Sequence, residues 1–484
     1  MIRKAFLTNS IGTLCSRVFG LVRDLCMASF LGAGILSDIF FVAFKFPNLC
    51  RRIFAEGAFI QSFLPNFIQA RKKGAFSVLV FGIFFGVIFI LSLFVWEFSG
   101  LVTKALANGF SEDQIALAKP IVAINFWYLE LIFVTTFLSS LLQYKNCFWV
   151  SAYNTALLNI CMIIALFFVR DIEDMRAVYI LSYGVLCGGL AQIALHFYPL
   201  FKLNYCRLFS VGIQEIWRVC KQKNETQTPR FKQILADIRS FFMRFFPAML
   251  GSSTAQIASF LDTVIASYLG AGAISYLYYA NRIFQLPLAL FAIAVSTALF
   301  PTIAKAVKNA QYTQALQLMK KSFWFLLLVL WVCVVGGVML KDEITWLLFE
   351  RNKFVREDTL AVGMAFGMYM LGLLPYGLVR IFSLWLYAHN LQGKAAKISA
   401  ISLLVGVGFS LVLMHPLGAS GLALASSLGG VLHFILTIRI FGMQHFIDIL
   451  KNTKGWIFLA IITALEILIL YIFKLYEHHF GILT

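Results

Sequence analysis

Charged residues are scarce in this sequence. They make up 13% of its 484 residues, against about 25% in soluble domains, while hydrophobic residues reach 61%. This balance excludes an ordinary soluble enzyme and a disordered chain. Apolar runs such as 76–98 and 456–473 are long, as in membrane-spanning helices, and lack the short alternation of a β-barrel. The sequence therefore predicts an all-α polytopic membrane protein.

Acidic residues are the scarcer charge, because 22 Asp and Glu face 40 Lys and Arg, a formal net charge of +18. No soluble basic domain accompanies this excess, which excludes nucleic acid as a partner. In a membrane protein Lys and Arg collect in cytoplasmic loops and set the orientation of the helices.

Motifs for catalysis, metals and nucleotides are also missing. The nine cysteines form no CxxC pair, the seven histidines form no HExxH, and no Walker sequence occurs. We therefore expect no enzyme activity and no cofactor. Any work must be driven by a monovalent ion, the membrane potential or consumption of the substrate.

Thirteen hydrophobic helices are predicted, and basic residues gather in alternate loops. This bias places the N-terminus and the basic stretch 202–237 in the cytoplasm and, with thirteen helices, the C-terminus outside. The predicted ranges are 5–31, 36–70, 76–98, 119–143, 148–169, 177–201, 238–269, 273–304, 315–340, 359–388, 395–414, 419–441 and 455–474.

An internal repeat organises these helices. The stretch 24–37 matches 262–275 at a constant offset of 238 residues, sharing Asp, Ala-Ser, Leu-Gly-Ala-Gly and Ser in register. An even number of helices separates the copies, so the repeat is parallel, with two six-helix halves. The predicted domains are an N-terminal lobe 1–201, a basic inter-lobe linker 202–237, a C-terminal lobe 238–441 and an extra C-terminal helix in 442–484.

Several ionisable residues fall inside the predicted helices. Each costs about 2.5–3.5 kcal/mol on insertion scales, so each is a candidate for function. At ~1.5 Å per residue, Arg23 lies ~13 Å and Arg17 ~22 Å from the turn at Gly32, near the middle of a ~30 Å core. Arg51 and Arg282 lie at similar depth.

The predicted helix 36–70 carries charge on one face. Asp38, Lys45 and Arg52 are spaced by seven residues, and Glu56 follows four after Arg52. Internal ion pairs, such as Arg23 or Arg17 with Asp24 and Arg52 with Glu56, are one explanation. They do not account for the whole set, which has six cations and four anions: Arg17, Arg23, Lys45, Arg51, Arg52 and Arg282 against Asp24, Asp38, Glu56 and Asp262. The cationic surplus predicts an anionic guest, and the guanidinium fork suits phosphate.

Three motifs resemble the MurJ/MviN flippases of the multidrug/oligosaccharidyl-lipid/polysaccharide exporter superfamily. They are SRVFGLVRD at 16–24, DIFFVAFKFPNLCRRIFAEGAF at 38–59 and YYANRI at 278–283. The resemblance covers the first twelve predicted helices.

The resemblance implies alternating access between two lobes in the bacterial cytoplasmic membrane. The implied cargo is lipid II, the undecaprenyl-diphosphate-linked disaccharide-peptide precursor of the cell wall, moved from the inner to the outer leaflet. It implies that the essential cavity arginines fall on Arg17, Arg23, Arg51 and Arg282, beside Arg52, and that the acidic cavity positions are Asp24, Asp38 and Glu56.

Three positions depart from the family pattern. Asn281 stands where the family commonly has Asp before the arginine. A sodium site in some relatives corresponds to Asp262, Ser410 and Ser426, but Gly406 and Ser410 replace expected Asn or Asp ligands. Many relatives also have fourteen helices.

Other functions stay open at this point. The alternatives are a flippase for another polyprenyl-diphosphate-linked oligosaccharide and a multidrug/cation antiporter, whose cavity would be acidic instead of arginine-rich. A polyprenyl-phosphate glycosyltransferase would need a carboxylate set that the loop 340–358 lacks.

Overall fold

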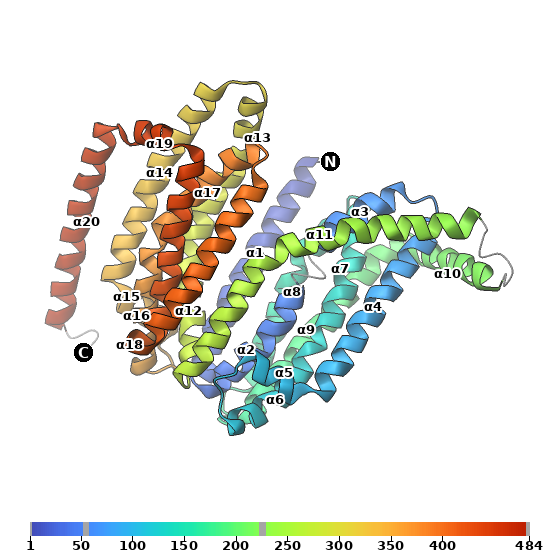
Figure 1. The fold of residues 1–484 in the computed structure, drawn as a ribbon. Helices are drawn as coiled ribbons and strands as arrows, with labels where there is room; N and C mark the ends of the chain where they lie inside the picture. Colours follow the sequence, from blue (N-terminus) through green and yellow to red (C-terminus); the bar gives the residue numbers. More distant parts are fainter. Residues whose placement is uncertain (1, 52–57, 222–228, 481–484) are drawn as a thin grey trace. The chain divides into compact units, whose positions relative to one another are not determined.

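Helices build this structure, a computed structural model that describes residues 2–51, 58–221 and 229–480. No strand occurs in those ranges. The chain divides into two compact units, Met1–Val264 and Ile265–Thr484. The predicted all-helical class is confirmed, and Figure 1 traces its helices in chain order.

The first unit holds eleven of the helices named here. They are α1 (Ile2–Leu31), α2 (Ile35–Cys50), α3 (Ala58–Gln69), α4 (Lys73–Glu97), α5 (Ser99–Leu106), α6 (Glu112–Phe126), α7 (Tyr128–Tyr144), α8 (Trp149–Phe168), α9 (Met175–Lys202), α10 (Tyr205–Lys221) and α11 (Pro229–Ala266), whose last two residues enter the second unit.

The second unit begins with a short 3₁₀ turn, η2 (Ser267–Leu269), and contains a π-helical turn, η3 (Leu288–Ile293). Its α-helices are α12 (Ala273–Pro287), α13 (Ala294–Lys308), α14 (Tyr312–Met339), α15 (Lys341–Phe349), α16 (Arg356–Leu371), α17 (Leu373–Ala388), α18 (Gln392–Phe441), α19 (Met443–Leu450) and α20 (Thr453–Phe480).

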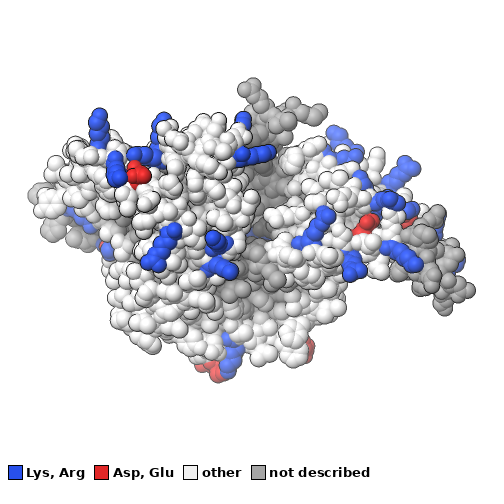
Figure 2. All heavy atoms as spheres, turned by 45° about the horizontal axis from the view of Figure 1, so that its top comes forward, with Lys and Arg blue, Asp and Glu red and all other residues white. Residues whose placement is uncertain are grey.

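Within the described ranges, nine helical segments are long and apolar enough to cross a membrane. One of them, α18, contains two of the predicted helices, because Gly418 inside it has the non-helical angles φ 56° and ψ −134°. The chain is therefore an integral membrane protein, while the count of thirteen stays a prediction. In each unit of Figure 2, Lys and Arg outnumber Asp and Glu on the face turned forward.

Two predicted helices are broken in the middle. The segment Glu112–Tyr144 is interrupted at Trp127, between α6 and α7, and Arg356–Ala388 is interrupted at Gly372, between α16 and α17. Each segment has 33 residues. Both halves of the chain thus contain a long apolar segment of the same length with a central break.

The first glycine of the repeated turn has a positive φ in both copies. Gly32 after α1 has φ 69°, and its counterpart Gly270 after η2 has φ 94°. Residues with a Cβ rarely adopt these angles, so the turn requires glycine at both places. The Ser37 hydroxyl donates to the Gly32 carbonyl at 2.7 Å and closes the first turn.

Small residues bring α1, α8 and α9 close together. A Cβ added at Gly12 of α1 would stand 2.6 Å from Ala152 Cβ of α8, and one at Gly184 of α9 would stand 2.5 Å from Ala165 Cβ. Without a hydrophobic driving force in lipid, such close packing is a main source of helix association. It fixes α8 beside the charged face of α1.

Aromatic rings fill the space between α3, α4 and α7. Phe59 packs edge-on against Phe84 at 5.3 Å and Phe133 at 5.6 Å, and Phe63 packs against Phe137 at 5.4 Å. Edge-to-face pairs contribute about 0.5–1.5 kcal/mol each beyond their buried area. This cluster is the core of the first unit around the middle of α7.

The amphipathic helix α10 lies directly against α4. A Cβ at Gly212 would come within 2.4 Å of the carbonyl carbon and oxygen of Gly74, and the Lys72 ammonium pairs with the Glu215 carboxylate at 2.5 Å. The close glycine crossing and the ion pair hold α10 at the start of α4.

We expect Gly212→Ala to loosen α10. The new methyl group meets backbone atoms that cannot rotate away, so the change should cost about 1–3 kcal/mol. The mid-point of thermal unfolding in detergent should fall and trypsin should cleave α10 faster. The matched control is Gly82→Ala on α4, where an added Cβ meets nothing within 4 Å. Equal behaviour of the two variants would contradict the proposed packing.

Candidate functional site

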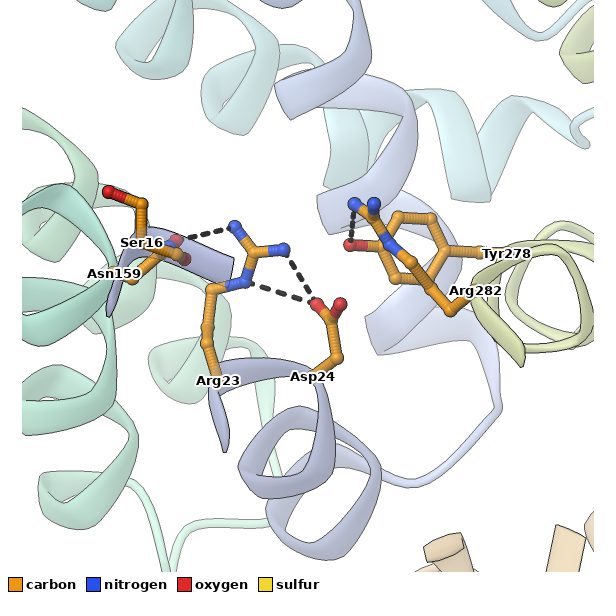
Figure 3. A network of polar contacts seen from close by, with 6 residues as sticks. All are labelled: Ser16, Arg23, Asp24, Asn159, Tyr278 and Arg282. Atoms are coloured by element: carbon orange, nitrogen blue, oxygen red, sulfur yellow. Dashed lines mark hydrogen bonds and ion pairs between the residues drawn. The ribbon is translucent and has the colours of Figure 1, made fainter. Parts of the chain in front are cut away.

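The charged end of α1 is tied into the first unit by a polar network (Figure 3). Arg23 is buried, with its Nη2 at 2.6 Å and its Nε at 3.1 Å from Asp24 Oδ1. Its Nη1 donates to Asn159 Oδ1 on α8 at 3.0 Å. Asn159 Nδ2 in turn donates to the Ser16 carbonyl at 3.2 Å. The guanidinium is therefore both charge-paired and held in orientation.

This network confirms one of the predicted ion pairs. The residue that contacts Asp24 is Arg23. Arg17 lies seven residues, about two helical turns, before Asp24 on α1, and its side chain is exposed. The partner Asn159 is 136 residues distant in sequence, and reasoning from the sequence alone did not identify it.

The helix α2 carries a buried carboxylate and a half-buried lysine. Asp38 in its first turn is fully buried. About two turns further along the same face, the Lys45 ammonium donates to the Thr263 hydroxyl of α11. A small hollow of about 10 Å³ lies here, lined by Lys45, Phe46 and Phe260 among others. It places a cation at the edge of a small, largely apolar space.

The end of α2 is the position of the predicted arginine pair. Arg51 caps the helix with its backbone N–H directed to the carbonyls of Asn48 and Pro47, and its side chain is half-buried. Arg52 and Glu56 lie outside the described residues, so their predicted pairing stays a prediction.

In the second unit, the candidate arginine lies on α12. The Arg282 guanidinium stacks over the Tyr278 ring, with its carbon 4.7 Å from the ring centroid, and Nη2 donates to the Tyr278 hydroxyl at 2.7 Å. Cation–π contacts of this kind contribute about 0.5–2 kcal/mol. The tyrosine fixes the direction of the guanidinium without neutralising its charge.

The segment that follows Arg282 is irregular. After Pro287 the helix continues as the π-helical turn η3, then resumes as α13. Such π turns occur frequently at functional sites. The preceding Asn281, which departs from the family pattern, accepts a hydrogen bond from Gln285 one turn on.

The three sodium candidates belong to different units of the chain: Asp262 to the first, and Ser410 and Ser426 to the second. Asp262 is half-buried near the end of α11, Ser410 is buried in α18, and Ser426 lies further along α18, where its carbonyl accepts from Tyr376. No group of three His, Cys, Asp or Glu side chains with metal-binding spacing occurs in the described ranges. Sodium binding by these residues stays a prediction.

One buried acid was missed by the sequence analysis. Glu130 lies inside the predicted helix 119–143 and is only 6% exposed. The sequence feature that could have identified it is a carboxyl group in an otherwise apolar run. No comparable sequence feature marks the helix break at Trp127, three residues earlier.

Known proteins resemble the chain along almost its whole length. The family model "Lipid II flippase MurJ" matches residues 27–484. A "Probable lipid II flippase MurJ" of Helicobacter pylori strain J99 is 56% identical over 453 residues, covering 94% of this chain and 98% of that protein. The protein of the same description from Rhizobium tropici is 30% identical over 457 residues, covering 92% and 82%.

Solved structures show the same fold. A lipid II flippase MurJ in an inward closed conformation aligns with a TM-score of 0.77 at 24% identity, covering 98% of this chain and 99% of that chain. An inward-facing multidrug resistance transporter of the MATE family aligns with a TM-score of 0.67 at 14% identity, covering 93% and 99%. These likenesses concern the fold, whereas the family model and the sequence relatives define the family: the chain belongs to the MurJ family of lipid II flippases.

Proposed function

We propose that this chain moves lipid II from the inner to the outer leaflet of the bacterial inner membrane for cell-wall synthesis. The observation that carries the proposal is the 56% identity to a MurJ protein over nearly the full length of both chains. The half-buried and buried cations on apolar helices support it, because an undecaprenyl diphosphate headgroup is an anion that must cross the membrane interior.

Within this proposal the diphosphate is bound by guanidinium groups. The contacts are assigned to Arg17, Arg23, Arg51, Arg52 and Arg282, and the acidic residues that balance or gate them are Asp24, Asp38 and Glu56. Arginine binds phosphate oxygens through two parallel N–H donors, which gives both attraction and orientation. The Arg282–Tyr278 stack supports this role because it holds the guanidinium in a fixed orientation.

Depletion of the protein tests the function. Lipid II should accumulate in the inner leaflet, and a membrane-impermeant reagent added outside should reach a falling share of it. Normal outer-leaflet lipid II during depletion would refute the proposal. Accumulation of another polyprenyl-diphosphate-linked sugar would instead favour the oligosaccharide flippase, and drug sensitivity alone would favour the antiporter that the MATE fold allows.

We also propose an orientation with the N-terminus and residues 202–237 in the cytoplasm. In α10 the basic residues Arg218 and Lys221 lie at the end of the helix, and Lys221 is exposed. Clusters of Lys and Arg beside membrane spans remain on the cytoplasmic side.

A single cysteine at position 221, placed in a cysteine-free background, should react with a membrane-permeant maleimide only. Labelling of whole cells by an impermeant maleimide would contradict this orientation. A cysteine at position 172, between α8 and α9, should react with the impermeant maleimide in whole cells, because the span α9 separates it from the cytoplasmic side. It is the matched control for access of the reagent.

The energy source is proposed to be a monovalent ion or the membrane potential. No nucleotide-binding motif occurs in the sequence. The residue that best fits ion coupling is an acid outside the arginine set, Glu130.

A further inference from the structure

The acid Glu130 lies just after the break in the segment Glu112–Tyr144. At the break the amide of Trp127 bonds the Ile124 carbonyl at 3.3 Å, and the amide of Glu130 bonds the Trp127 carbonyl at 3.2 Å. These three-residue bonds replace the regular pattern of an α-helix. At ~1.5 Å per residue, Glu130 is ~27 Å from Glu112 and ~21 Å from Tyr144, near the middle of the span.

Aromatic residues lie one helical turn before and one turn after Glu130, on the same face of the helix. Residues one turn away on either side engage neighbouring helices through ring contacts. Phe126 packs on Phe46 of α2 at 4.9 Å, and Phe133 packs on Phe84 of α4 at 5.6 Å. This segment is also the most buried of the nine candidate spans.

Neither carboxyl oxygen of Glu130 has a hydrogen-bond partner in the part of the chain that the structure describes. An isolated carboxylate in so apolar a place costs far more than a neutral carboxylic acid. The contacts therefore favour the neutral, proton-carrying form of this side chain in this conformation.

Other titratable groups on the helices packed against α7 do not supply the missing partner. His196 of α9 uses both ring nitrogens, on Ser139 Oγ and the Gln192 carbonyl, each at 2.7 Å. The described α3 carries no charged residue. The remaining charged groups are Asp38 and Lys45 on α2, Lys73 and Glu97 at the ends of α4, Glu112, Asp113 and Lys119 on α6, and Arg176 and Lys202 at the ends of α9. The other titratable groups are Tyr128, which donates to Gln192, Tyr144, which accepts from Lys73, Cys50 on α2, and Tyr179, Tyr183, Cys187 and Tyr198 on α9.

The break itself does not require an acid. In the second half of the chain the matching break is at Gly372, and the residue three positions later is Pro375. The two segments have the same length and the same break, but only the first places a carboxyl group there. A purely structural role for Glu130 leaves this difference unexplained.

We propose that Glu130 is a proton-binding site coupled to the transport cycle. The carboxyl group holds a proton in this conformation and gives it to water when α7 moves at its break and the side chain becomes hydrated. A metal cation fits the position poorly, because it needs several oxygen ligands and no group of three His, Cys, Asp or Glu that could hold a metal occurs in the described ranges. The inference rests on the proposed function, since it names the ion that drives the movement.

Infrared difference spectroscopy on the purified full chain tests the proton directly. Wild type should show the C=O band of a protonated carboxylic acid in an apolar environment, and Glu130→Gln should lose it. Glu97→Gln, which removes an exposed acid at the end of α4, should keep the band and is the matched control. A wild-type spectrum without a band that depends on Glu130 would overturn the proposal.

Proteoliposomes loaded with lipid II test the coupling. An imposed pH gradient should speed wild-type and Glu97→Gln translocation several-fold and leave Glu130→Gln unchanged, while Glu130→Asp should respond in part. An equal response of wild type and Glu130→Gln would overturn the coupling. Absence of any lipid II movement by wild type would refute the proposed function instead, and the infrared result would still decide the proton site.

Discussion

Arg282→Ala should abolish growth of a strain that depends on this protein, while the variant still inserts at normal levels. The change removes the guanidinium that stacks on Tyr278 and that we assign to the diphosphate. Hydrogen bonds to charged groups contribute about 1.5–3 kcal/mol each, so loss of a two-bond contact should lower transport by at least tenfold. Complementation and immunoblotting of the membrane fraction measure the two quantities separately.

Two further variants separate the charge from its positioning. Arg282→Lys keeps a positive charge without the planar fork and should support only slow growth. Tyr278→Phe keeps the ring under the guanidinium and loses the 2.7 Å hydrogen bond, so it should be much milder than Arg282→Ala. Full growth with Arg282→Ala would show that the diphosphate is bound elsewhere.

The helices could be predicted from the sequence because a membrane-spanning helix needs a long apolar run, and such runs are visible in a single sequence. The Gly32 and Gly270 turns could be predicted as well, since a shared Leu-Gly-Ala-Gly marks them in both copies. The break at Trp127 could not, because the proline before it, Pro120, lies seven residues away. The break at Gly372 was not predicted either, although Pro375 lacks the amide hydrogen that would bond the carbonyl of Leu371.

The site shows the same division between local and distant contacts. Tyr278 lies four residues before Arg282 on one helix. Side chains at this spacing are neighbours, so this contact could have been predicted from the sequence. The bond from Arg23 to Asn159 was not, because it depends on the close crossing of α1 and α8 that Gly12 and Ala152 permit. A single sequence contains no direct signal for such a pair.

A test of Arg23 must separate its structural contacts from transport. Arg23→Ala removes two hydrogen bonds to Asp24 and one to Asn159, and leaves the buried Asp24 carboxylate without the adjacent positive charge. Breaking one side of a buried ion pair costs about 3–5 kcal/mol. The single variant should therefore be present at a low level in the membrane and should not support growth.

The double variant Arg23→Ala with Asp24→Ala decides between the two roles. Removing both charges avoids a buried carboxylate that has lost the Arg23 charge, so the protein level and the thermal unfolding mid-point should recover most of the loss. If Arg23 also binds the diphosphate, growth should still fail, because the restored fold lacks the guanidinium. Asn159→Ala, which removes the bond that orients Arg23 and the bond to the Ser16 carbonyl, should fold and transport at a reduced rate. Growth of the double variant at the wild-type rate would reduce Arg23 to a partner of Asp24 and move substrate recognition to the other arginines.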